Sequence, residues 1–271
     1  MTKEIDSRFR GNDTFMKPNI YSVEDIKKLS EGGYILSRIL KYLLKMAQEQ
    51  KTGDEIEKIA QKLIRESSGE PAFMEAKDEK GENYPAAICL SINEGVVHGI
   101  PYGQEIKVGD VVSIDIGLRY KGLVTDMAWT IYVEGKDLRI KQMLQQNEQA
   151  LKLACKQAIA NNQINNISRE IEQMAKAGGF YPVAELSGHG VGKNLHEAPS
   201  IYNVPLENIK QKTLREGMVI AIEPIFALNS YQKLHFKDNW GIILPDNITS
   251  HFEFTVAVGA KPKILTPSPL A

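Results

Sequence analysis

Three segments of this 271-residue chain combine the pattern of a buried strand with a single carboxylate. Asp115 lies in Val-Val-Ser-Ile-Asp-Ile, Glu223 in Val-Ile-Ala-Ile-Glu-Pro-Ile and Glu253 in His-Phe-Glu-Phe-Thr-Val. Runs of β-branched and aromatic residues predict strands inside a core. Because an unpaired carboxylate is costly in such a place, each of these acids needs a neutralising partner. Divalent cations would supply one.

A fourth carboxylate, Asp126, follows a segment with the polar, glycine-flanked character of a hairpin tip, residues 117–125. If the turn centres on Tyr120 and Lys121, Asp115 stands directly opposite Asp126, with Cβ atoms about 5 Å apart. Two like charges at that distance repel by about 3 kcal/mol at an effective dielectric constant near 20. We therefore expect a cation between them. The alternative is a solvated hairpin end with two unrelated acids.

A histidine between two glycines, His189 in Ser-Gly-His-Gly-Val-Gly, provides a nitrogen ligand. The glycines would let the imidazole project freely and let a ligand approach. Alone this pattern is a weak signal, since any glycine-rich turn can hold one histidine. Four carboxylates would balance two divalent cations, and a neutral imidazole adds no charge. The candidate metal ligands are Asp115, Asp126, His189, Glu223 and Glu253.

The order of the motifs resembles that of the methionine aminopeptidases of the bacterial type, a family of metallopeptidases. The motifs are HGIP at His98, IDIG at Asp115, TD at Asp126, GHGVGKNLHE around His189, IEP at Glu223 and FEFT at Glu253. The resemblance covers nearly the whole chain, from about Lys17 to Thr266. It implies an α+β fold of the pita-bread type, with two pseudo-symmetric α/β halves around a dinuclear metal site.

The resemblance also implies a role for each ligand. Asp115 would bind one metal ion, and His189 and Glu223 would bind the other. Asp126 and Glu253 would bridge both ions. Oxygen-rich ligation with one imidazole suits Mn²⁺, Fe²⁺ or Co²⁺ better than a thiolate-type zinc site, with Zn²⁺ remaining an option.

Further residues acquire roles in the same way. His98 and His196 match the two non-ligand histidines of the family, which hold the substrate and stabilise the tetrahedral intermediate, and Glu223 would relay a proton. Tyr84 and Trp240 would line the pocket for the methionine side chain, although simple core packing explains them as well. The other two histidines match no motif, and we interpret them as structural: His235 and His251.

The implied function is removal of the N-terminal methionine from newly made polypeptides with a small second residue. Metal-activated water would attack the first peptide bond, and the free α-amino group would bind a metal ion. Only 27 positions separate His196 from Glu223, which leaves no space for the insertion of type 2 enzymes. Two alternatives stay open: an X-Pro aminopeptidase or dipeptidase of the same fold, and a non-catalytic pita-bread binding protein.

The composition is typical of a globular enzyme without a charged or membrane-bound partner. The chain is 42% hydrophobic and 25% charged, with a net charge of −1, which provides no drive toward nucleic acid or an acidic membrane. Two cysteines are too few for a disulfide framework. No apolar run is long enough to span a membrane. We expect a cytoplasmic monomer. Transient association with the ribosome is compatible with this prediction.

The elements that must position the site are predicted from capping and periodicity. Ser22 with Asp25 and Thr52 with Glu55 form capping boxes that begin two helices, ending near Gln50 and Gly69.

A second helix pair is predicted over residues 137–160 and 168–176, so that in both halves a helix pair precedes strands with site residues. Residues 1–15 have no apolar periodicity, and we interpret them as a disordered or non-native extension. Residues 16–271 would form a single pita-bread catalytic domain.

Overall fold

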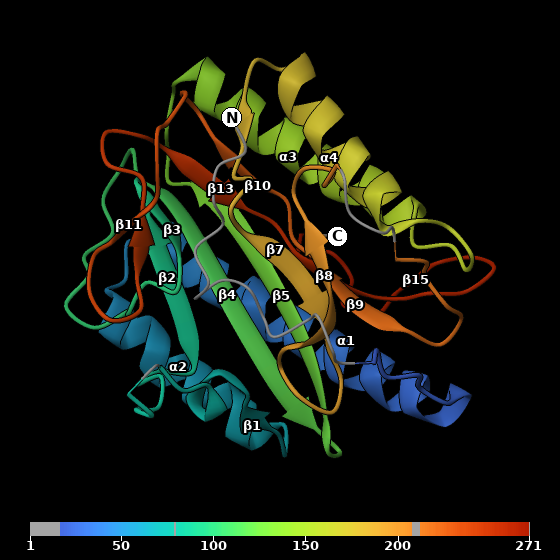
Figure 1. The fold of residues 1–271 in the computed structure, drawn as a ribbon. Helices are drawn as coiled ribbons and strands as arrows, with labels where there is room; N and C mark the ends of the chain where they lie inside the picture. The colour runs from blue at the N-terminus through green and yellow to red at the C-terminus, as the bar shows by residue number, and fades with distance from the viewer. Residues whose placement is uncertain (1–16, 79, 208–211, 271) are drawn as a thin grey trace.

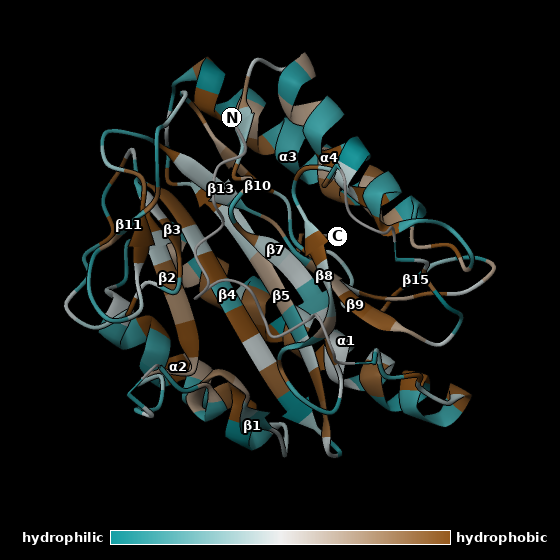
Figure 2. Cartoon of the chain, in the orientation of Figure 1, coloured by the Kyte–Doolittle hydropathy of each residue, from teal (hydrophilic) through white to brown (hydrophobic). Residues whose placement is uncertain are grey.

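The computed structural model describes residues 17–78, 80–207 and 212–270. The extension predicted over residues 1–15 lies outside these residues. Two helix pairs flank antiparallel strands in the described part of the chain (Figure 1). Hydrophobic residues line the strands, and hydrophilic residues dominate the outer faces of the helices (Figure 2). The fold therefore has its apolar core between the helices and the sheets.

The first helix pair begins at the two capping boxes that the sequence predicts. In α1 (Val23–Gln48) the Ser22 hydroxyl accepts the N–H of Asp25, and the Asp25 carboxylate accepts the N–H of Ser22. In α2 (Gly53–Glu66) Thr52 and Glu55 repeat the same exchange. Each box satisfies backbone donors that the first turn of a helix leaves free.

The second pair consists of α3 (Leu138–Lys156) and α4 (Ile164–Ala177). The carboxylate of Asp137 caps α3 as expected, because it accepts the N–H groups of Arg139 and Ile140. Helix α4 begins four residues before the predicted start at Ser168. Its N-cap residue is Gln163, whose side chain makes no capping hydrogen bond, so the sequence carries no capping signal there.

The first sheet is built on one long hairpin, β4 (Val111–Tyr120) and β5 (Leu123–Tyr132). Strand β2 (Ile88–Ile92) pairs with β4, and the short β1 (Glu70–Pro71) pairs with its far end. Helix α1 contacts both strands of the hairpin and lies behind them in Figure 1. A short 3₁₀ turn, η2 (Phe73–Glu75), follows β1.

The register of the hairpin differs from the predicted one. Asp126 pairs with Gly117, and Asp115 pairs with Ala128. The turn residues are Lys121 (φ 50°) and Gly122 (φ 79°), and two positive φ values are what a two-residue type I′ turn requires. The predicted direct opposition of the two aspartates is therefore wrong. They lie diagonally on one face, because residues two positions apart on a strand point the same way.

The second sheet runs in the order β15-β14-β9-β7-β8 and belongs to the second half of the chain. Its strands are β7 (Ser187–Gly190), β8 (Glu197–Tyr202), β9 (Val219–Ile222), β14 (Phe254–Ala257) and β15 (Lys263–Ile264). One small sheet joins β6 (Tyr181–Pro182), β10 (Ile225–Ala227) and β13 (Thr249–His251), and another joins β3 (Gly95–Val97), β11 (His235–Phe236) and β12 (Ile242–Ile243).

The two halves share one core and are joined beside the candidate ligands. The N–H of Glu253 donates to the Ala128 carbonyl across 2.9 Å, which ties the second half to β5. Below this junction the ring of Trp129 meets that of Phe252 edge-on, with centroids 4.9 Å apart. The main core cluster includes side chains from all four helices and from both sheets. Within the described residues, no helix is both long and apolar enough to cross a membrane.

Candidate metal centre and peptide site

One cavity of about 300 Å³ is lined by residues of both halves. It brings together every site residue predicted from the sequence: Tyr84, His98, Asp115, Asp126, His189, His196, Glu223, Trp240 and Glu253. These residues come from different strands and loops, so the fold rather than local sequence gathers them. Polar groups lie beside an apolar, aromatic wall, the arrangement expected of a small-ligand site.

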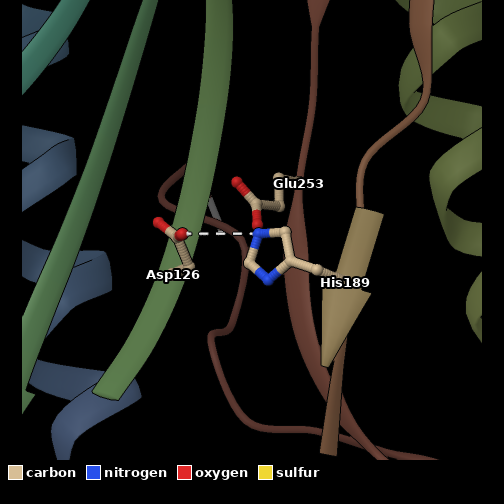
Figure 3. A group of neighbouring side chains, drawn as sticks. All are labelled: Asp126, His189 and Glu253. Carbon is tan, nitrogen blue, oxygen red and sulfur yellow. Dashed lines mark ion pairs between the residues drawn. The ribbon is translucent and has the colours of Figure 1, made fainter. Parts of the chain in front are cut away.

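The centre of the cavity is a group of three residues from three segments. Asp126 on β5, His189 on β7 and Glu253 just before β14 each offer a ligand atom, and these atoms all lie within 4.8 Å of one another. Figure 3 shows both carboxylates beside the imidazole, with His189 Nε2 3.9 Å from Asp126 Oδ2. Asp126 and Glu253 are 3% and 2% exposed, so little water reaches these charges.

The remaining two predicted ligands adjoin this group. Glu223 follows β9, and its Oε1 lies 3.5 Å from His189 Nε2. Asp115 lies on β4, two strand positions from the pairing partner of Asp126. One oxygen each of Asp115, Asp126 and Glu253 is buried without a hydrogen-bond partner in the described structure. Since buried polar atoms are nearly always paired, these three orphaned oxygens fit a site that binds a cation.

The electrostatics agree with that conclusion. Burial, and then the nearby charge of Glu223, raises the pKa of Asp115 to about 7. Burial raises the pKa of Asp126 and of Glu253 well above the ordinary range, and the neighbouring carboxylates raise both further. Burial lowers the pKa of His189 to about 4, so its ring is neutral at pH 7. A neutral imidazole with carboxylates that resist ionisation fits a divalent-cation site.

The glycines beside His189 have a packing role that differs from the predicted one. A Cβ on Gly188 would sit 2.3 Å from the carbonyl oxygen of Ala221 on β9, and one on Gly190 would sit 2.3 Å from that of Ala198 on β8. Both neighbours are backbone, which cannot move aside. The glycines therefore let the neighbouring strands approach the backbone on either side of His189.

The two non-ligand histidines lie on separate segments of the cavity wall. His98 follows β3 in a left-handed conformation (φ 56°), and burial lowers its pKa to about 4. His196 is the more exposed and precedes β8. Its ring meets that of His189 edge-on, with centroids 4.5 Å apart and planes at 80°. Desolvation, and then the nearby ring of His189, lowers the pKa of His196 below its usual value.

The apolar wall is an aromatic cluster around Tyr84. The ring of Trp240 meets Tyr84 edge-on at 5.1 Å between centroids, and Phe73 meets it edge-on at 6.4 Å. The Tyr84 hydroxyl lies within hydrogen-bond distance of the Gly99 and Ile88 carbonyls, at 2.9 and 3.2 Å. This fixes the ring against the strand that carries Cys89, another lining residue. The contribution of Phe73, from the short 3₁₀ turn, has no signal in the sequence.

Sequence reasoning also missed His251. His251, which matches no motif and is interpreted from the sequence as structural, lines the cavity and is 2% exposed. Its Nε2 lies 3.5 Å from Glu223 Oε2, at the outer limit of hydrogen-bond distance. The only available signal was position, since His251 lies two residues before Glu253 and points to the same side of an extended segment. His235 lies on the exposed β11 and does not line the cavity.

Comparison with known proteins agrees with this geometry. Residues 27–260 match the model of metallopeptidase family M24. The methionine aminopeptidase of Aquifex aeolicus is 34% identical over 256 residues, which cover 93% of this chain and 99% of the relative. The crystal structure of methionine aminopeptidase from Thermotoga maritima has a TM-score of 0.81 at 29% identity, covering 92% of this chain and 99% of that one.

A prolidase from Pyrococcus furiosus shares the fold at a lower level. Its TM-score is 0.68 at 22% identity, and the match covers 97% of this chain but 66% of the prolidase. The predicted pita-bread fold is confirmed by these neighbours. With a family model over most of its length and relatives of this identity over nearly all of theirs, the chain belongs to metallopeptidase family M24, among the methionine aminopeptidases.

Proposed function

We propose that this protein is a metal-dependent aminopeptidase that removes the N-terminal methionine from newly made polypeptides with a small second residue. The observation that carries the proposal is the cavity in which a carboxylate-rich centre adjoins an aromatic wall. The family relatives act as a second support, since the similar enzymes are methionine aminopeptidases.

The ligand set fits two divalent ions. Asp115 would hold one ion, His189 and Glu223 the other, and Asp126 and Glu253 would contact both. This division of the ligands follows the family resemblance, and the orphaned buried oxygens of Asp115, Asp126 and Glu253 support a cation site at these residues. When bound, such ions polarise a carbonyl and lower the pKa of water toward neutrality. Oxygen-rich ligation with one imidazole favours Mn²⁺, Fe²⁺ or Co²⁺, with Zn²⁺ as the further option.

The aromatic wall would select the first side chain of the substrate. Tyr84, Trp240 and Phe73 provide flat apolar surfaces in the wall of the cavity. A methionine side chain is unbranched and polarizable, and thioethers contact aromatic ring edges favourably. Beside this wall, the free α-amino group of the substrate, once deprotonated, would bind a metal ion held by the carboxylates. A substrate held at both ends places its first peptide bond between them.

The histidines and Glu223 would act on that bond. Because burial keeps His98 neutral, one of its ring nitrogens donates a hydrogen bond, and we place that donor on the peptide near the leaving nitrogen. His196 would donate to the oxygen that becomes negative in the tetrahedral intermediate. The carboxylate of Glu223 would carry a proton from the attacking water toward the leaving amine.

Several broader features of the protein belong to the same proposal. We infer that residues 16–271 act as one catalytic domain and that the enzyme is a cytoplasmic monomer. Both cysteines are buried and unpaired, a usage typical of a reducing compartment. The substrate is a peptide with a free N-terminal methionine, and transient contact with the ribosome would place the enzyme beside that substrate.

The test compares two peptides before and after metal replacement. The protein is stripped with EDTA and refilled anaerobically with Mn²⁺, Fe²⁺ or Co²⁺, and cleavage of Met-Ala-Ser and Ala-Pro-Ala is measured. We expect metal-dependent release of methionine from the first peptide alone. Glu253→Gln should abolish it, and Glu105→Gln, at an exposed site away from the cavity, should not. Cleavage of Ala-Pro-Ala alone would indicate an X-Pro peptidase, and bound metal without cleavage would indicate a binding protein.

A further inference from the structure

A tyrosine ahead of the first helix reaches the loop that carries His196. Tyr21 directly precedes the N-cap of α1 and is 5% exposed. Its hydroxyl lies 2.8 and 3.0 Å from the two carboxylate oxygens of Glu197 and donates its proton there. The same hydroxyl accepts the backbone N–H of Lys193 across 2.7 Å. One side chain therefore holds both ends of the segment from residue 193 to residue 197.

The ring of Tyr21 is held as firmly as its hydroxyl. Gly192 has a φ of +150°, and a Cβ at this position would lie 2.3 Å from the ring, so the ring packs directly on the glycine backbone. Behind the ring, the N–H of Tyr21 donates to the Gly217 carbonyl across 2.8 Å. Tyr21 thus connects the segment before α1 to a loop that begins 172 positions later in the chain.

The carboxylate of Glu197 accepts the hydrogen bond from the Tyr21 hydroxyl. Its Oε1 also accepts the N–H of Asn194 across 2.8 Å, so its carboxylate closes the loop as well as anchoring it. At 8% exposure the carboxylate needs such donors. Two other contacts hold the start of the loop: Val124 donates to the Gly192 carbonyl at 2.6 Å, and Arg119 donates to the Lys193 carbonyl at 3.1 Å. At the other end of the loop, the backbone of Glu197 pairs with Gly190 between β8 and β7, and Tyr21 holds the Glu197 side chain.

We propose that Tyr21 is a positioning residue for His196, which sets the imidazole at the cavity through Glu197. The inference rests on the proposed function, in which His196 stabilises the tetrahedral intermediate. His196 and Glu197 are consecutive and both line the cavity. Since a small misplacement of a catalytic group costs rate, the hydroxyl of Tyr21 contributes to kcat without touching the substrate.

Tyr21→Phe tests the inference, because phenylalanine keeps the ring against Gly192 and removes only the hydroxyl. On metal-loaded enzyme with Met-Ala-Ser, we expect kcat to fall about tenfold to hundredfold, since misplacing a catalytic group costs up to about that much. KM should change much less. In the background of His196→Ala, the same substitution should lower kcat no further. A full, multiplicative loss in that background would show that Tyr21 acts elsewhere and would overturn the proposal.

The chain offers a matched control. The Tyr231 hydroxyl likewise lies 2.7 Å from a carboxylate, that of Glu185, and accepts a backbone N–H, that of Ala184, at 3.1 Å. Tyr231→Phe removes the same chemistry without contacting the loop of His196. We expect Tyr231→Phe to lower Tm as Tyr21→Phe does but to leave kcat near the wild-type value. Equal losses of kcat in both variants would mean a general effect of stability and would contradict the proposal.

A second measurement needs no turnover. Amide hydrogen exchange of Lys193 and Asn194, measured by mass spectrometry on the full chain, should speed up in Tyr21→Phe and not in Tyr231→Phe. Unchanged exchange would show that Tyr21 does not hold the loop. If the wild type released no methionine, the proposed function would fail, and the exchange rates would still decide whether Tyr21 orders this segment.

Discussion

His251 Nε2 lies 3.5 Å from one carboxylate oxygen of Glu223, and His189 Nε2 lies 3.5 Å from the other. Glu223 therefore lies between two imidazoles, only one of which belongs to the predicted ligand set. Partners behind a metal ligand fix its orientation, and their loss typically costs about 10-fold to 100-fold in metal affinity. This relationship gives His251 a role that its sequence motif does not indicate.

We expect His251→Ala to weaken Mn²⁺ binding by about tenfold or more, because Glu223 loses one of its two neighbours. His251→Gln, whose amide nitrogen reaches about the position of Nε2, should keep most of the affinity. Isothermal titration of the EDTA-treated protein with Mn²⁺ measures both. The control is His235→Ala on the exposed strand β11. Wild-type affinity in His251→Ala would show that Glu223 is oriented without it.

The metal-free protein should lose stability as the pH rises above about 6.5. Burial raises the pKa of Asp126 and of Glu253 well above its ordinary value in the folded state, so both bind protons there at pH values at which the unfolded chain has released them. The folded state then binds more protons, so the free energy of unfolding falls with pH, by about 1.4 kcal/mol per pH unit for each carboxyl that stays protonated. The lowered pKa of His189 and of His98 opposes this trend only below about 6.5, where unfolded imidazoles are protonated.

Calorimetry in EDTA between pH 6.5 and 8.5 measures this slope. Asp126→Asn removes one of the titrating groups and should flatten the dependence of Tm on pH. Mn²⁺ should remove most of the dependence in the wild type, because a bound cation stabilises the ionised carboxylates. The same slope in wild type and Asp126→Asn would mean that the buried carboxylates are not its source.

Local signals in the sequence predicted much of the fold, and the failures have identifiable causes. The capping boxes located the starts of α1 and α2 because a cap is a contact between neighbours in sequence. The predicted start of α4 was wrong because the true N-cap residue, Gln163, makes no side-chain capping hydrogen bond that the sequence could signal. The hairpin register was wrong because Lys121, a residue that rarely adopts positive φ, occupies the first position of the turn beside Gly122.

The site residues likewise divide into those with a local signal in the sequence and those without one. Asp115, Glu223 and Glu253 could be proposed as ligands because a carboxylate within a buried strand conflicts with its surroundings, and that conflict is visible in sequence. The sequence around His251, Phe73 and Tyr21 shows no such conflict. The roles of these residues depend on contacts between distant segments. The Tyr21 hydroxyl, for example, meets Glu197 across 176 positions of the chain. No periodicity or spacing encodes such a pair.

Trp240→Ala should weaken the binding of the substrate side chain more than it slows the reaction. Trp240 contacts Tyr84 edge-on in the wall of the cavity and is not one of the proposed metal ligands. We expect KM for Met-Ala-Ser to rise about tenfold, equivalent to about 1.4 kcal/mol of binding. Steady-state kinetics on peptides with methionine, norleucine and phenylalanine test this. Tyr34→Ala, at an exposed position on α1, is the control. A fall in kcat at constant KM would contradict a role in binding.

Thr255 forms a two-way clasp on the backbone of Asp126. Its hydroxyl accepts the N–H of Asp126 at 2.9 Å and donates to the carbonyl of the same residue at 2.8 Å. Thr255 is fully buried and lies two residues after Glu253, so the clasp fixes the spacing between the two proposed bridging carboxylates. The ladder hydrogen bond from Glu253 to Ala128 lies beside it.

Thr255→Val keeps the shape of the side chain and removes both hydrogen bonds, leaving a buried N–H and a buried carbonyl without partners. We expect the free energy of unfolding to fall by about 1–3 kcal/mol, and Mn²⁺ affinity to fall with it because Asp126 and Glu253 are no longer held in register. Thr255→Ser retains the hydroxyl and should preserve affinity even though it loses a buried methyl group. Urea unfolding and Mn²⁺ titration of the two variants separate the contributions. If the serine variant lost as much affinity as the valine variant, the methyl contact rather than the clasp would set the geometry of the centre.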